Sequence, residues 1–135
     1  MNGAINFFIK NRIPEGEVVK FLDGRITQGV ESLDFPNEKT ALFLQYFECA
    51  EGFQQSAGLA WGLSDFELDE VSVAGDLAKA FSTQVLFQPQ SLKLPVGMEW
   101  CLVTSDGGLY AVNVLELSDG VDLSGDGNQI RLASR

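Results

Sequence analysis

The chain contains no histidine among its 135 residues. Histidine is the usual general base near neutral pH and the commonest transition-metal ligand, so its absence excludes Ser-His and Cys-His nucleophilic pairs. Only two cysteines are present, Cys49 and Cys101, which are too few for a zinc site of Cys and His ligands. We therefore expect a non-enzymatic protein with no catalytic residues, no metal and no cofactor.

Lysine and arginine are missing from two long stretches. Between Lys39 and Lys79 the chain has seven Asp and Glu residues and no basic residue, and between Lys93 and Arg131 it has six and none. The formal net charge of the whole chain is −10. An acidic surface attracts cationic partners and repels the phosphates of nucleic acids. We therefore expect a basic protein partner and no direct binding of nucleic acid.

Long apolar runs and a targeting segment are also missing. No run approaches the roughly 18 apolar residues of a membrane-spanning helix, and the start of the chain has no basic segment or cleavage site. We expect a cytoplasmic protein with no membrane contact. An apolar content of 45% with ten phenylalanines is typical of a folded body, and the length fits one domain over residues 1–135. Cys49 and Cys101 lie in apolar runs and are interpreted as buried, reduced thiols.

The first half of the chain predicts mainly strands. Ile5–Ile9 is a short apolar run typical of a strand. Pro14–Gly24 fits either a short helix with a glycine cap or a hairpin with an Asp-Gly turn, and we favour the hairpin. Thr40–Cys49 is apolar on both alternating faces, which predicts a central strand covered on both sides. Ala50–Leu63 is expected to turn back as its partner strand, ending near Trp61.

A helix is expected in the middle of the chain. Ser64 and Glu67 have the spacing of a capping box, which marks a helix N-terminus. An apolar stripe with helical spacing then runs from Ala74 to Phe81. Gln84–Gln88 follows as a short strand that Pro89 would end.

The last third of the chain predicts a hairpin. Glu99–Thr104 and Leu109–Leu117 are rich in β-forming residues and flank a short turn at Asp106–Gly108. Ser118–Gly127 is interpreted as a Gly/Asp-rich loop before a last strand at Gln129–Leu132. These elements together predict one α+β domain, a mostly antiparallel sheet of about five or six strands with one or two helices packed on a face.

The densest acidic cluster lies near the expected helix start. Its four carboxylates fall within six residues and must point into water or meet cations, because they repel one another. One interpretation is a solvated helix N-terminus, where acidic groups meet the positive end of the helix dipole. The other is a docking patch for a basic partner, with two neighbouring rings as anchors, although such rings also serve in cores. The candidate partner-binding residues here are Trp61, Asp65, Phe66, Glu67, Asp69 and Glu70.

A second acidic group follows the hairpin and contains Asp119, Asp122 and Asp126. The segment that starts at Asp122 resembles the opening of a calcium loop. That loop needs a bidentate Glu at its twelfth position, where this chain has Ala133. We therefore predict no metal site and interpret the segment as a Gly/Asp turn with local side-chain caps. The three carboxylates are the second set of candidate partner-binding residues.

The chain resembles the small acidic immunity proteins of bacterial polymorphic toxins, including contact-dependent growth inhibition systems. The resemblance rests on size, acidity, the lack of catalytic groups, the helix-to-strand unit Asp76–Phe87 and the hairpin from Glu99 to Val114. It implies a monomer or weak dimer that binds a toxin domain, such as a basic nuclease, and masks its active site. Two other classes stay open, a type III secretion chaperone that binds an effector and a carboxylate-based hydrolase.

Overall fold

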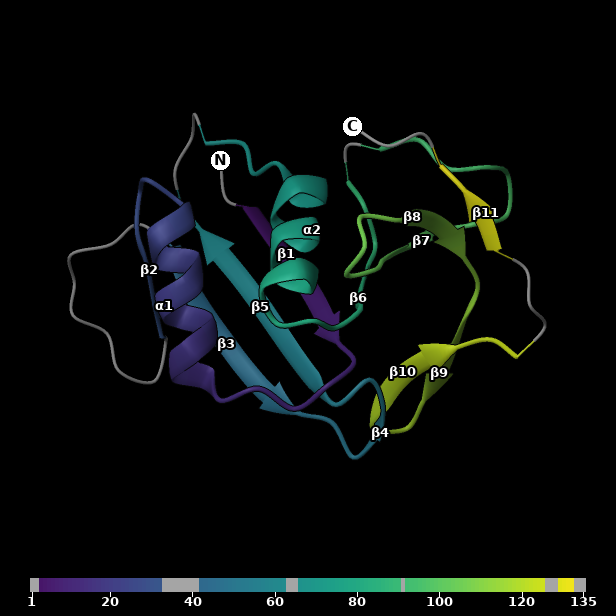
Figure 1. Cartoon of the computed structure of the whole chain (residues 1–135), viewed down its shortest axis with the longest axis horizontal. Helices are drawn as coiled ribbons and strands as arrows, with labels where there is room; N and C mark the ends of the chain where they lie inside the picture. The colour runs from purple at the N-terminus through teal and green to yellow at the C-terminus, as the bar shows by residue number, and fades with distance from the viewer. Residues whose placement is uncertain (1–2, 33–41, 63–65, 91, 126–128, 133–135) are drawn as a thin grey trace.

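The computed structural model describes residues 3–32, 42–62, 66–90, 92–125 and 129–132. They form an α+β fold with two helices and eleven strands. Eight strands make one sheet in the order β11-β8-β7-β6-β1-β5-β3-β2, and three make a second sheet in the order β4-β10-β9 (Figure 1). The α+β class is therefore confirmed, with more strands than the five or six expected from the sequence.

Most neighbouring strands run antiparallel, as expected. The two exceptions are the parallel pairs β2–β3 and β4–β10. The large sheet consists of β1 Gly3–Ile9, β2 Val30–Ser32, β3 Leu42–Glu48, β5 Gln55–Trp61, β6 Val85–Phe87, β7 Trp100–Val103, β8 Leu109–Val112 and β11 Gln129–Arg131. The small sheet consists of β4 Glu51–Gly52, β9 Val114–Leu117 and β10 Gly120–Leu123.

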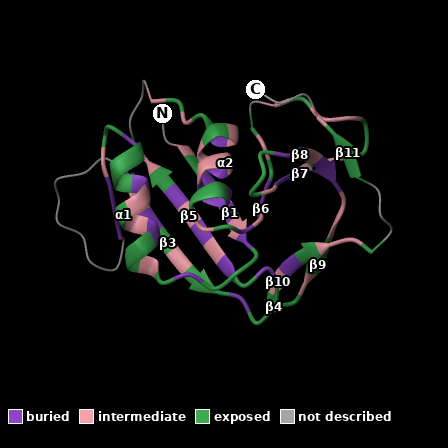
Figure 2. Ribbon diagram, viewed as in Figure 1, coloured by how far each residue is buried: buried purple, intermediate pink, exposed green. Residues whose placement is uncertain are grey.

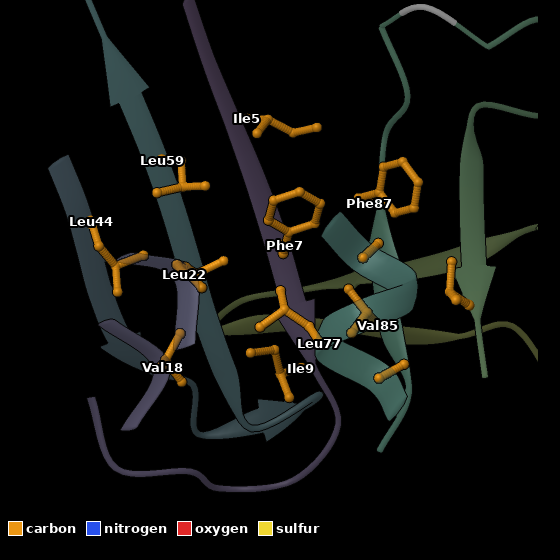
Figure 3. Close-up of a cluster of buried hydrophobic side chains, with 14 of the residues drawn as sticks. Ile5, Phe7, Ile9, Val18, Leu22, Leu44, Leu59, Leu77, Val85 and Phe87 are labelled. Atoms are coloured by element: carbon orange, nitrogen blue, oxygen red, sulfur yellow. The ribbon is translucent and has the colours of Figure 1, made fainter. Parts of the chain in front are cut away.

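Both helices lie on the same face of the large sheet, which confirms the expected layering. Helix α1 (Glu15–Arg25) lies beside β2 and β3, and α2 (Glu70–Ala80) lies over β1, β6 and β7 (Figure 1). The main core fills the space between this face and the helices. Figure 3 shows Val18 and Leu22 of α1 and Leu77 of α2 pointing toward strand residues of that core. The small sheet packs on the opposite face and encloses a second apolar cluster of Phe53, Leu86, Leu102, Val112 and Val121.

The preference for a hairpin over Pro14–Gly24 is wrong, because this segment forms α1. Val18 and Leu22 are four residues apart, lie on one side of the helix and are completely buried. The Asp-Gly pair lies inside the helix, and the Asp23 carboxylate accepts a hydrogen bond from the Val30 amide at 2.9 Å. Tertiary burial of the apolar stripe therefore outweighs the local turn preference.

The prediction of a central strand covered on both faces over Thr40–Cys49 is also wrong. Strand β3 is second from the β2 edge, and the centre of the sheet is occupied by β6 and β1. Leu42 and Leu44 face the helices and are fully buried, whereas Phe47 on the other face is 55% exposed. Apolar residues on both faces of this strand therefore do not mean that both faces are covered.

The Leu109–Leu117 run is not one strand. Asn113 separates β8 from β9, and the chain passes there from the large sheet into the small one. The expected Ser118–Gly127 loop contains strand β10, which pairs antiparallel with β9 and parallel with β4. Gly120 has φ +149° where a Cβ would collide with the Glu51 carbonyl, so glycine permits this close approach of β10 to β4.

Helix α2 begins later than the capping box predicts. Its first residue is Glu70 and its N-cap is Asp69, whose carboxylate accepts a hydrogen bond from the Ser72 amide at 3.2 Å. Ser64 lies outside the described residues. The predicted apolar stripe is confirmed, with Ala74, Leu77 and Ala78 fully buried.

Candidate functional site

In the first acidic cluster, Glu70 does not point into water. Its side chain is 4% exposed, and one carboxylate oxygen accepts a hydrogen bond from the Gln90 amide at 2.7 Å. This contact ties the first turn of α2 to the segment that follows β6. The assignment of Glu70 to an exposed docking patch is therefore wrong, because this carboxylate serves the fold.

Asp69 and Glu67 are exposed, and they differ in what they contact. Asp69 caps α2 through the Ser72 amide, so its charge lies at the positive end of the helix dipole. Glu67 lies two residues earlier in a stretch without regular secondary structure. Asp65 lies outside the described residues. Of the predicted carboxylates in this cluster, Asp69 therefore fits the helix-terminus interpretation, and Glu67 remains exposed.

Trp61 and Phe66 contact each other. Their ring centroids are 5.2 Å apart with an interplanar angle of 79°, an edge-to-face arrangement. Both rings are half-buried against the main core, and the Trp61 ring lies directly over Gly3 of the neighbouring strand β1. The pair holds the segment before α2 against the end of the sheet, so both rings have a structural role.

A groove of about 750 Å³ runs between the end of α1 and the segment before α2. Glu67 and Asp69 line it from one side and Arg25 from the other. Arg25 also forms an ion pair with Asp76 of α2. The groove therefore combines charges of both signs, and a cation from α1 offsets part of the first acidic cluster.

The second acidic group lies on the small sheet. Asp119 is in the turn between β9 and β10, and Asp122 lies within β10. Asp119 accepts a hydrogen bond from the Ala50 amide at 2.9 Å, and Asp122 accepts one from the Leu123 amide at 2.8 Å. Both side chains are exposed. Asp126 lies outside the described residues.

The fold adds two carboxylates to this group that the sequence analysis did not select. Glu51 lies on β4, and its carboxylate accepts hydrogen bonds from the Ser118 hydroxyl at 3.0 Å and the Asp119 amide at 3.3 Å. Glu116 lies on β9, paired with Val121 of β10. The β4–β10 pairing brings Glu51 next to residues almost 70 positions later, and no sequence motif indicates that contact.

We call Glu51, Glu116, Asp119 and Asp122 the small-sheet carboxylates. All four are exposed. Glu51, Asp119 and Asp122 accept hydrogen bonds from backbone amides and one serine hydroxyl, which are neutral. Among the described residues, none of the four forms an ion pair with Lys or Arg, while the nearby Glu48 is 3.8 Å from Arg12. The small-sheet carboxylates are therefore not offset by a partner cation in the described part of the chain.

The two thiols are free and buried, as expected. Burial, together with the Glu70 carboxylate, raises the pKa of Cys101 to about 12. Burial and the Asp119 carboxylate raise the pKa of Cys49 above its usual value. A raised pKa keeps a thiol protonated and unreactive at neutral pH, so neither cysteine is an activated nucleophile.

The predicted turn at Asp106–Gly108 is confirmed between β7 and β8. The Thr104 hydroxyl and the Gly108 amide both donate hydrogen bonds to the Asp106 carboxylate. These bonds lower the pKa of Asp106 because they stabilise its ionised form. Gly107 has φ +92°, a left-handed conformation that favours glycine. This carboxylate therefore stabilises a turn.

Comparison with known proteins gives no relative from which a role could be transferred. No protein-family model matches the chain, and no curated protein and no solved structure matches it significantly.

In the described part of the chain, no group of three or more Cys, Asp or Glu side chains is placed to hold a metal ion. Neither described helix has the length and apolar character needed to cross a bilayer.

Proposed function

We propose that this protein is a non-enzymatic inhibitor that binds a basic protein domain in the cytoplasm through its small sheet. The observation that carries the proposal is the set of small-sheet carboxylates, which are exposed and form no ion pair with Lys or Arg in the described part of the chain, while three of them accept hydrogen bonds from neutral donors. Hydrogen bonds from amides and hydroxyls orient a carboxylate but do not cancel its charge. The negative field of these groups therefore extends into solvent toward a cationic partner.

The partner class follows from charge complementarity. Proteins that act on nucleic acids bind phosphates through Lys and Arg side chains, so their substrate sites are cationic. A protein that offers carboxylates to such a site competes with the phosphates and blocks substrate entry. This supports a toxin of the nuclease type as the partner and an immunity protein as the role of this chain.

Apolar contact area lies beside the charges. Leu115 of β9 is 51% exposed and pairs across the hairpin with Asp122 of β10. An apolar side chain beside a carboxylate on the same face is an arrangement found in interfaces, where the core of the contact is apolar and its rim is polar. The carboxylates would then accelerate the encounter, and contacts such as Leu115 would slow dissociation.

Co-expression with the product of the adjacent gene tests the proposed role. If that product is a toxin, the chain should restore growth and co-purify with it, and the purified complex should have lost the toxin activity. Growth inhibition that persists in the presence of a stable, folded chain would contradict the proposal, as would turnover of a substrate by this chain alone.

Charge reversals locate the interface on the folded surface. The double variant Glu116→Lys and Asp122→Lys should slow association with the co-purified partner by about tenfold at low salt. The matched control is Glu17→Lys and Glu67→Lys, which changes the net charge equally on α1 and in the first acidic cluster. Stopped-flow measurements at several salt concentrations give both rates. If the control pair slows association more than the small-sheet pair, the proposed interface is wrong.

A further inference from the structure

The face of β1, β5 and β3 that points away from the helices carries no charged side chain. In the strand pairings, residues aligned with each other share a face of the sheet. The helix-facing set contains the buried core residues, and the opposite set alternates with it (Figure 2). We call that opposite set the neutral face, and it consists of Ala4, Asn6, Phe8, Ser56, Gly58, Ala60, Phe43, Gln45 and Phe47.

No described element covers most of the neutral face. The small sheet packs under β6, β7 and β8, where Leu86 and Leu102 are buried, and its apolar cluster reaches only as far as Phe8. Beyond that border Ala4, Gln45 and Ala60 are exposed, and Phe47 is 55% exposed. On the β2 side Glu31 aligns with Phe43 and so lies on the same side of the sheet, but it is 4% exposed and presents no open charge there. Exposed apolar side chains on an uncharged sheet face are a feature of interaction sites.

The neutral face has a projection at one end and a hollow at the other. Phe47 lies near the end of β3 and pairs with Ser56. A shallow hollow of about 470 Å³ lies near the opposite end of the strand, where Ala4, Phe43 and Ala60 contribute to its lining. Between them, Gly58 has no side chain, and the Asn6 side chain lies close by and accepts a hydrogen bond from Ser56 at 3.0 Å. The middle of the face therefore has no large apolar side chain, and its exposed side chain is the uncharged Gln45.

This arrangement is complementary to itself. In a two-fold symmetric contact, residue i of one copy touches residue j of the other, and j touches i. A two-fold axis near Gln45, midway between Phe43 and Phe47, places Phe47 of each copy over the hollow of the other copy. The sheets would then pack face to face about 10 Å apart, as sheets do in sandwiches.

Charge also points to a second copy as the occupant. Two chains that each carry a net charge of −10 repel each other, most strongly where their carboxylates meet. The neutral face has no carboxylate of its own, so packing two such faces together brings no carboxylate of these faces against another. For the same reason it offers no carboxylate to a basic partner. We propose that the neutral face is the interface of a two-fold symmetric homodimer, formed independently of the small sheet.

The size of the face predicts a weak dimer. Three seven-residue strands cover roughly 23 Å by 14 Å, or about 300 Å² per copy, against roughly 800 Å² per partner in a standard stable interface. Because like charges lie around the interface, salt should strengthen the dimer by screening their repulsion. Binding of a basic partner has the opposite salt dependence, so the two associations can be told apart.

Sedimentation of the purified chain over a range of protein concentrations measures the dimer directly. The average mass should rise above the 14.7 kDa of one chain as the concentration increases, and more steeply at high salt than at low salt. A mass that stays at one chain at every concentration and salt level would overturn the proposal. So would a dimer that weakens as salt is added.

Phe47→Glu should lower the dimer affinity by at least about tenfold. The matched control is Leu115→Glu, which introduces the same charge at a leucine of similar exposure on the small sheet and should leave the dimer intact. Far-UV circular dichroism confirms that both variants are folded. Equal loss of dimer in both variants would contradict the assignment to the neutral face.

A mixing experiment tests the two-fold geometry itself. F47E and A60R chains should each be monomeric, because each loses the contact between Phe47 and the hollow in both halves of the dimer. Mixed together, they should form a heterodimer, since one half regains the original contact and the other half gains an ion pair. If the mixture dimerises no better than either variant alone, Phe47 does not meet Ala60 across a two-fold axis. All three experiments use this chain alone, so their failure would leave the proposed inhibitory function unaffected.

Discussion

The segment around the start of α2 and the small sheet are both rich in carboxylates, but the fold uses these groups differently. Near α2, the buried Glu70 carboxylate accepts a hydrogen bond from the Gln90 amide, Asp69 caps the helix and Asp76 forms an ion pair with Arg25. On the small sheet, the carboxylates accept hydrogen bonds from amides and a hydroxyl and form no ion pair with a described Lys or Arg. A similar acidic density in the sequence therefore produces a structural site in one region and an exposed charged surface in the other.

This difference shows why carboxylate spacing alone does not locate a binding surface. An acidic residue at a helix start can stabilise the helix, pair with a cation from another element or face solvent, and each outcome leaves a different surface charge. Which outcome occurs depends on the neighbouring elements. The two regions can be separated experimentally, because a structural carboxylate affects stability whereas a surface carboxylate affects association.

The largest stability difference is expected at Glu70. Glu70→Ala should lower the free energy of unfolding by about 1–3 kcal/mol, because the change removes the buried Glu70 side chain and the Gln90 amide loses its acceptor. Glu116→Ala on the small sheet should change it by less than about 0.5 kcal/mol. Urea unfolding of both variants gives the comparison, and Glu70→Gln, which keeps an oxygen acceptor, should cost less than Glu70→Ala. Equal effects at the two positions would remove the distinction between the regions.

A smaller difference is expected between Asp69 and Asp122. Asp69→Ala removes the N-cap of α2 and should cost about 1 kcal/mol, whereas Asp69→Ser keeps a capping oxygen and should restore most of that loss. In the part of the chain that the structure describes, Asp122 accepts a hydrogen bond from the adjacent Leu123 amide of its own strand and forms no ion pair, so Asp122→Ala should be close to neutral. Thermal unfolding at neutral pH measures all three. If Asp69→Ala is as neutral as Asp122→Ala, the cap does not contribute to stability.

An effect confined to alkaline pH is expected at Cys101, the thiol beside Glu70. In the unfolded chain a thiol ionises near pH 9, whereas burial and Glu70 keep Cys101 protonated to about pH 12 in the folded chain. The unfolded state therefore loses its proton first, and stability falls as the pH rises above 9. Urea midpoints measured at neutral and alkaline pH should fall less in Cys101→Ala than in the unmodified chain. The same fall in both would show that the thiol is not responsible.

Part of the fold could be predicted from the sequence because local patterns decide it. The β7–β8 hairpin follows from its turn residues, and the stripe from Ala74 to Phe81 correctly marks the buried side of α2. Pro14–Gly24 was ambiguous because its Asp-Gly pair favours a turn, while burial of Val18 and Leu22 against a distant strand favours the helix. Short strands such as β2 and β4 have too few residues for a pattern.

The candidate site could be predicted only in part. Asp119 and Asp122 were identified from composition, but Glu51 joins them through the pairing of β4 with β10, which only the tertiary structure provides. The sequence does not indicate that Glu70 is buried, because its hydrogen bond with the Gln90 amide, twenty residues later, is a tertiary contact. The sequence does not predict the neutral face. Apolar residues on both faces of β3 indicate burial on both sides, and only the tertiary structure shows that the small sheet ends before it covers the side of β3 that points away from the helices.

The surface potential of the free protein tests the central claim most directly. Paramagnetic relaxation of backbone amides by a cationic and by an anionic nitroxide at low ionic strength reports the local charge, because a negative surface concentrates the cation. We predict a higher ratio of cationic to anionic enhancement at the amides of Val114–Leu117 and Gly120–Leu123 than at those of Glu67–Val73. An equal ratio in the two regions, or a higher one around α2, would contradict the account.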